Sequence, residues 1–174
     1  RVDAIHCMAD DSRPHIVTEL AATFDSLRPQ CSRHLHLIAE SNVYDARMLQ
    51  SRQWGGHGYD AEWCDDFLHS VFAVLRPGEQ MSQRVYGGED LQSVLERGYV
   101  FAGSLQVPRQ RIAPDEDPRR ADLGALIYSI QNHDFIGNHP LGKRLHQLTS
   151  DDAHRAAPAL IVLLPAIPLL CMGA

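Results

Sequence analysis

The chain has 174 residues, 44% of them hydrophobic and 22% charged, which is ordinary for a soluble globular domain and indicates no function by itself. The 16 Lys and Arg residues against 22 Asp and Glu give a formal net charge of −6, and no basic cluster is interleaved with aromatic residues. This argues against a nucleic-acid partner, because nucleic acids bind to concentrated positive charge.

The cysteines and the apolar tail exclude further classes of protein. The four cysteines are widely spaced, without a Cys-x-x-Cys pair, so neither a zinc knuckle nor a disulfide framework is expected, and a reducing, cytoplasmic setting fits best. The mostly apolar run at 156–172 is too short for a membrane span and is interrupted by prolines, which predicts buried core and no membrane partner. The oligomeric state is left open.

The beginning of the chain predicts two units, each a strand followed by a helix. Residues 2–5 form an apolar run broken only by Asp3, which predicts a strand. Apolar residues at helical spacing then predict a helix that ends before Pro29. A second apolar run at 35–39 precedes a short helix at about 43–49. Because the first strand starts at once, without an initiator Met, we expect a segment of a longer protein.

The rest of the chain continues the alternation. Residues 107–120 contain three prolines and many charged side chains, a composition that buries too little apolar surface to order itself, and we expect a mobile loop there. The other predicted elements are strands at about 59–62, 125–130 and 167–172, and helices at about 67–75, 90–97, 141–148 and 152–164.

Strands that alternate with helices at this spacing are typical of right-handed βαβ units and a parallel sheet. An open sheet and a barrel both fit the alternation, but polar residues gather where strands end, as on the active face of a (β/α)8 barrel. The predicted fold is α/β, a partial (β/α)8 TIM barrel that lacks the first three strands. Residues 1–174 then form a single partial catalytic domain.

Acidic residues close three of these strands: Asp3, Glu40 and Asp134. Cleavage of a glycosidic bond needs a nucleophilic carboxylate, a proton donor for the leaving oxygen, and stabilisation of an oxocarbenium-like transition state. Three acids on three strands can meet these needs. On spacing alone the alternative remains open, because single carboxylates at strand ends also cap helices or pair with Arg.

Three short motifs around these acids carry a family resemblance. Arg-Val-Asp-Ala at 1–4, Ile-Ala-Glu at 38–40 and Gln-Asn-His-Asp at 131–134, in this order, resemble the strand-4, strand-5 and strand-7 signatures of the α-amylase superfamily. The resemblance implies that Asp3 is the nucleophile, Glu40 the general acid/base and Asp134 the transition-state stabiliser.

The sequence between the motifs narrows the family. Segments at 1–6, 36–40, 44–47, 58–69 and 167–173 look like the malto-oligosyltrehalose trehalohydrolases. That family is expected to hydrolyse the α-1,4 bond next to the terminal trehalose of a maltooligosyl trehalose, with retention and without a metal or organic cofactor. The substrate contacts that the resemblance implies are Arg1, which also orients the nucleophile, and His6, Trp63, Asp66, Asn132 and His133.

Several alternatives stay open. The glycogen branching enzymes share the catalytic motifs, as do other α-amylase-type glucan hydrolases. An isolated piece of a barrel leaves open strand edges, so a non-catalytic segment is a further possibility, and so is a carbohydrate-binding module. Trp63 equally fits packing. Asp65 and Asp66 fit either the binding of sugar hydroxyls, with one of them favoured as a substrate contact, or the cap of the helix that follows them.

Overall fold

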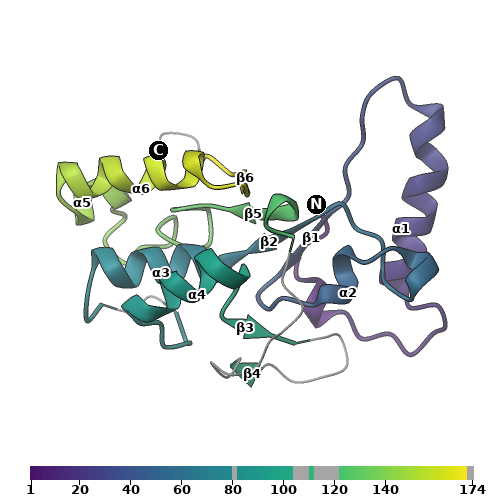
Figure 1. The fold of residues 1–174 in the computed structure, drawn as a ribbon, viewed down its shortest axis with the longest axis horizontal. Coiled ribbons are helices and arrows are strands. Elements are labelled where there is room, and N and C mark those ends of the chain that lie inside the picture. Colours follow the sequence, from purple (N-terminus) through teal and green to yellow (C-terminus); the bar gives the residue numbers. More distant parts are fainter. Residues whose placement is uncertain (80–81, 104–109, 112–121, 172–174) are drawn as a thin grey trace.

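The computed structural model describes residues 1–79, 82–103, 110–111 and 122–171, and its centre is a four-stranded sheet (Figure 1). The strand order is β1-β2-β5-β6, and each neighbouring pair runs parallel. The α/β class and the parallel sheet are thereby confirmed, and the sheet is consistent with part of a (β/α)8 barrel. The strands are β1 (Ile38–Ser41), β2 (Ala61–Cys64), β5 (Leu126–Tyr128) and β6 (Ile167–Pro168).

The strand predicted at 2–5 is wrong in extent, because only Val2 pairs with the sheet. Val2 forms a parallel bridge to Ala39. Its N–H donates to the carbonyl of Ile38 at 2.8 Å, and its carbonyl accepts from the N–H of Glu40 at 2.9 Å. Ala4 then adopts a left-handed conformation with φ of 47°, which ends the extended backbone, and a 3-10 turn, Ile5–Cys7, follows.

The helices follow the predicted order, with shifts at their ends. In Figure 1, α1 and α2 lie beyond the β1 edge of the sheet, whereas α3 to α6 lie toward β5 and β6. The helix predicted from 141 begins only at Leu145, and the last helix continues through Pro158. The helices are α1 (Ile16–Leu27), α2 (Ala46–Leu49), α3 (Asp65–Leu75), α4 (Gly88–Arg97), α5 (Leu145–Leu148) and α6 (Asp151–Leu163).

A small antiparallel pair, β3 (Phe101–Ala102) and β4 (Gln110–Arg111), was not predicted. The expected loop at 107–120 lies outside the described residues except for β4. No helix within the described ranges is both long and apolar enough to cross a membrane.

Two buried clusters hold the strand ends in place. The larger one joins α3 and α4 to the sheet, and its centre is a stack of Phe67 on Tyr128 with ring centroids 4.3 Å apart. The smaller one packs α1 against β1 through residues such as Val17, Ala21 and Ala39. Burial of each large apolar side chain contributes about 1.5–3 kcal/mol. These contacts fix α3 directly behind the end of β2.

Candidate active site

The three predicted acids lie in segments at the carboxyl edge of the sheet. In the register of β1 and β2, Glu40 lies opposite Trp63, and β5 leads into the loop that carries Asp134. Parallel neighbouring strands end at the same edge, so the residues that follow them share one face. Two interactions link the acids more directly, one near Glu40 and one near Asp134.

The first link joins the segment of Asp3 to Glu40. Because Val2 bridges to β1, the next residues lie along the end of that strand, and the N–H of Ala4 donates to Glu40 Oε2. Arg1 Nη2 pairs with Asp3 Oδ1 on the same segment. The Asp3 side chain is 68% exposed, so its carboxylate is open to a ligand. The bridge therefore carries an ion-paired acid to the vicinity of a second, half-buried one.

The second link runs through Asp65, for which the sequence left sugar binding and helix capping both open. The pKa of Asp65 is raised to about 6, mainly by burial and to a smaller extent by the negative charges of Glu40, Asp66 and Asp134. The hydrogen bond from Trp63 acts in the opposite direction. Asp65 is therefore close enough to both acids to sense their charge, and the only signal in the sequence was its place directly after a strand.

The indole of Trp63 packs against two of the other predicted substrate contacts, Arg1 and His133. The guanidinium of Arg1 lies over its indole, 4.6 Å from the ring centroid, and the ring of His133 meets it edge-on at 6.3 Å. Only 8% of Trp63 is exposed, so little ring surface remains for a sugar. Three of the predicted substrate contacts are thus brought together, with the indole as their packing support.

The loop of Asp134 is shaped by Asn132. The buried Asn132 side chain accepts hydrogen bonds through Oδ1 from the N–H groups of Asp134, at 3.0 Å, and Phe135, at 2.7 Å. This local turn projects Asp134 and His133 outward, with side chains 69% and 58% exposed. Asn132 was predicted to contact substrate, but its oxygen is used to hold the loop.

His6 lies on the same side, in the turn that follows the Val2 bridge. Its Nδ1 accepts from the N–H of Asn42, in the loop after β1, at 3.5 Å. The ring is half-buried, so part of it is open to a ligand.

Asp66 does not belong to this face, contrary to its prediction as a substrate contact. Its side chain is 4% exposed and its carboxylate is fully engaged within the protein. Oδ2 accepts the N–H groups of Val100 and Phe101 at 2.6 and 2.7 Å, and Oδ1 accepts the hydroxyl of Tyr86 at 2.6 Å with Arg84 at 3.6 Å. No oxygen is left for a sugar hydroxyl, so Asp66 acts on the fold.

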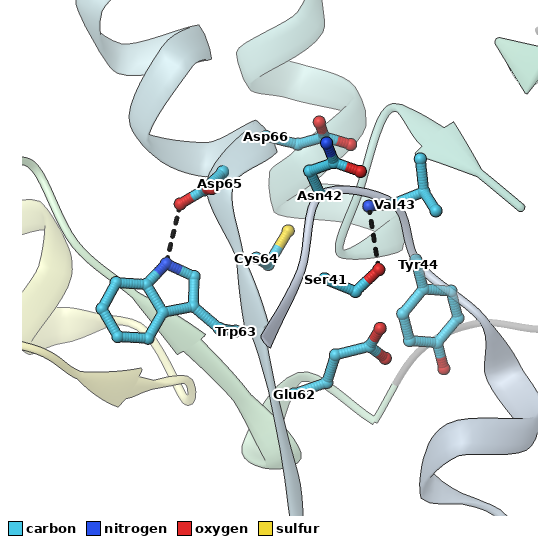
Figure 2. A pocket seen from close by; sticks show the side chains of 9 residues that line it. All are labelled: Ser41, Asn42, Val43, Tyr44, Glu62, Trp63, Cys64, Asp65 and Asp66. Carbon is cyan, nitrogen blue, oxygen red and sulfur yellow. Dashed lines mark hydrogen bonds between the residues drawn. The ribbon is translucent and has the colours of Figure 1, made fainter. Parts of the chain in front are cut away.

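A small, partly open pocket of about 10 Å³ lies beside the ends of β1 and β2 and the start of α3 (Figure 2). Figure 2 shows Glu62 and Trp63 on opposite sides of β2, as strand alternation requires. Glu62 is 1% exposed, and burial raises the pKa of its carboxyl well above the ordinary value. The N–H of Asp45 lowers that pKa in part, yet no described group meets either oxygen at hydrogen-bonding geometry.

Within the described part of the chain, no group of three or more His, Cys, Asp or Glu side chains is arranged to hold a metal ion. The face carries three carboxylates: one beside a guanidinium, one beside a backbone N–H, and one on an exposed turn.

Comparisons with known proteins point to one group of enzymes. No family model matches the chain. It is 36% identical to the malto-oligosyltrehalose trehalohydrolase of Arthrobacter ramosus, over 99% of this chain and 30% of that enzyme. The enzyme of the same name from Deinococcus radiodurans is 36% identical, over 99% and 28%, and that from Saccharolobus solfataricus is 29% identical, over 99% and 30%.

The structure is also similar to a Salmonella typhimurium protein assigned as an α-amylase. The TM-score is 0.70 at 28% identity, over 98% of this chain and 30% of that one. The chain thus spans about 30% of the length of the curated relatives that it matches.

Proposed function

We propose that this chain, homologous over 99% of its length to the malto-oligosyltrehalose trehalohydrolase family, carries the catalytic carboxylates of an α-retaining glycoside hydrolase. Its substrate is a maltooligosyl trehalose, and the bond cleaved is the α-1,4 linkage next to the terminal trehalose. The observation that carries the proposal is geometric: Arg1 pairs with Asp3, and the N–H of Ala4, next to Asp3, donates to Glu40.

The residue types fit a double displacement. Asp3 attacks the anomeric carbon while Glu40 protonates the departing oxygen, and trehalose leaves. Water then attacks the glycosyl ester, with Glu40 as the base, and releases a maltooligosaccharide. Arg1 orients and balances the charge of the Asp3 carboxylate. Asp134 stabilises the positive charge that develops on the sugar.

Each neighbour of the reacting groups has a part in this scheme. His133 extends beside Asp134 on the exposed turn, with Nε2 3.3 Å from Oδ2, where it can bind a sugar hydroxyl. His6 reaches the same face from the turn after Asp3. Neither role requires a metal or an organic cofactor.

The decisive experiment compares two substrates in the native protein that carries this sequence. We expect trehalose from maltooligosyl trehalose and little product from a plain maltooligosaccharide of equal length, with Glu40→Gln as the inactive control. Transfer of a glucan chain to a 6-hydroxyl would indicate a branching enzyme, and random release of maltose an ordinary amylase. Either result would refute the proposed specificity, and loss of all cleavage would refute the enzyme assignment.

Retention is tested separately by proton NMR of the first product. We expect the new reducing end of the maltooligosaccharide to appear as the α-anomer, because two inversions at one carbon restore its configuration. An initial β-anomer would mean a single displacement, and Asp3 would then lose its role as nucleophile.

A further inference from the structure

Asp65 lies between the segments that carry the proposed catalytic groups, and a helix cap is one of the roles expected for it from the sequence. It is the first residue of α3, directly after β2. Its Oδ1 accepts one hydrogen bond from Trp63 Nε1 at 2.7 Å and a longer one from Asn132 Nδ2 at 3.5 Å. Trp63 belongs to the strand and Asn132 to the loop after β5, so one oxygen joins two elements (Figure 2 draws the Trp63 bond).

Each of these partners leads to one of the reacting groups. On the Trp63 side, the indole carries the guanidinium of Arg1, which pairs with Asp3. On the other side, Asn132 Oδ1 holds the N–H of Asp134 at 3.0 Å. A continuous chain of contacts therefore runs from the proposed nucleophile to the proposed stabiliser, with Asp65 at its centre.

A helix cap is the ordinary explanation for an acid in this position, and the contacts do not support it. Asp65 accepts hydrogen bonds from two side chains, and none of the described N–H groups of α3 donates to it. By contrast, α6 has a true cap in the residue that precedes it, since Ser150 Oγ accepts from the N–H of Ala153.

The location is also unfavourable for a group that serves stability alone. Asp65 lies in a largely buried site close to two other carboxylates, Glu40 and Asp134, and next to Asp66. Burial and like charge both disfavour its ionised form. A carboxylate held in such a place is characteristic of functional sites.

We propose that Asp65 is a positioning residue of this site. Through one carboxylate oxygen it holds Trp63 and Asn132 in place, and so sets the distance between the segment that carries Asp3 and the loop that carries Asp134. The inference rests on the proposed function and adds a residue to it. Misplacement of a reacting group by about 1 Å can reduce turnover on the order of 100-fold, so the link has a measurable effect.

The test uses two substitutions and a matched control in the native protein. Asp65→Ala removes both hydrogen bonds, whereas Asp65→Asn keeps a neutral oxygen as acceptor. Asp151→Ala is the control, because Asp151 is the first residue of α6 but is exposed. At pH 8 we expect kcat to fall about 100-fold in Asp65→Ala and about 10-fold in Asp65→Asn, with KM within about threefold, and no change in the control.

The pH profile separates positioning from general damage. Protonation near pH 6 converts Asp65 to a neutral acceptor, so the kcat ratio of wild type to Asp65→Asn should decline from about 10 at pH 8 toward 1 at pH 5. Equal kcat for Asp65→Ala and Asp151→Ala would overturn the inference. If Asp65→Ala does not fold, a pH-independent ratio for Asp65→Asn would overturn it equally.

A spectroscopic measurement keeps this inference distinct from the proposed function. The indole N–H resonance of Trp63, assigned with Trp63→Phe, should titrate with a midpoint near pH 6 in the wild type and not in Asp65→Asn. Titration without trehalose release would defeat the proposed function but leave the link intact. Trehalose release without titration would defeat the link alone.

Discussion

The strand-end face and the helix layer behind it use the same residue type in opposite ways. On the face, the side chains of Asp3 and Asp134 are 68% and 69% exposed, and each contacts a basic side chain within two positions in the chain. In the helix layer, Asp66 is 4% exposed and joins α3 to residues more than 30 positions later in the chain. An exposed acid with a partner nearby in the chain is thus available for chemistry, whereas a buried acid with partners remote in the chain stabilises the fold.

The boundary between the two regions falls between adjacent residues. Asp65 faces the site and accepts from side chains at two strand ends, whereas Asp66 accepts the hydroxyl of Tyr86 and two backbone N–H groups. Successive residues at the start of a helix point about 100° apart, so one faces the strand ends and the next faces the layer behind. A substitution of Asp65 should therefore lower activity without loss of stability, whereas a substitution of Asp66 should lower the free energy of unfolding.

The largest expected effect is on the face. Glu40→Gln should lower kcat for trehalose release about 10³–10⁴-fold, because the variant can neither protonate the leaving oxygen nor activate water. The free energy of unfolding should change by less than about 1 kcal/mol, since Glu40 is only half-buried. Steady-state kinetics and urea unfolding measure the two quantities. A folded variant with near wild-type kcat would remove Glu40 from the mechanism.

Next in size is the reverse case in the helix layer. Asp66→Ala should reduce the free energy of unfolding by about 3–5 kcal/mol, because Tyr86, Val100, Phe101 and Arg84 all lose their buried acceptor. Chemical denaturation measures the change, with Asp151→Ala as a neutral control. A loss below about 1 kcal/mol would show that the helix layer does not depend on this carboxylate.

Asp65→Asn should change stability and activity in opposite directions: it should stabilise the fold and lower activity. The pKa of Asp65 is raised from 3.8 to about 6, so its ionised form is disfavoured in the folded state. The stability that the neutral form contributes is present below pH 4 and is lost as pH rises through 6. Removal of the charge should therefore add about 1–3 kcal/mol at pH 8 and little at pH 4, measured by thermal unfolding at both. A destabilised variant at pH 8 would contradict this sign.

The smallest effect is expected at Glu62, on the far side of β2. Burial raises the pKa of its carboxyl well above 4.5, so the neutral acid is favoured and wild-type stability should decline as pH rises above that value. In Glu62→Gln this decline should be reduced by about 1 kcal/mol between pH 5 and 9, with kcat unchanged. An identical pH dependence in both proteins would show that Glu62 finds a partner in solution.

Much of the architecture was predictable from the sequence, since apolar runs and helical spacing report directly on burial. The strands at 59–62 and 125–130 and the helix containing Phe67 were found within a few residues of their observed bounds. The first strand was overestimated, because an apolar run does not reveal the left-handed conformation of Ala4. The pair of β3 and β4 was missed because two-residue strands leave no periodicity.

The site was predictable only in part. The motifs singled out Asp3, Glu40 and Asp134; the N–H of Ala4, next to Asp3, donates to Glu40, and the charges of Glu40 and Asp134 both act on Asp65. The different roles of Asp65 and Asp66 could not be predicted from the sequence, because two adjacent acids at the start of a helix fit the same pattern. Their difference lies in partners that are remote along the chain, and only tertiary structure brings Tyr86 to one and Asn132 to the other.

The Val2 bridge has a consequence for how the site could be observed. Its two backbone hydrogen bonds, to Ile38 and from Glu40, are also what aligns the Asp3 segment with β1. The amide hydrogen of Glu40 is thus exposed to solvent whenever these segments separate. The rate at which it exchanges with deuterium would therefore report how often the Asp3 segment separates from β1. Exchange at this single backbone amide would in this way measure the fraction of molecules in which Asp3 is held next to Glu40.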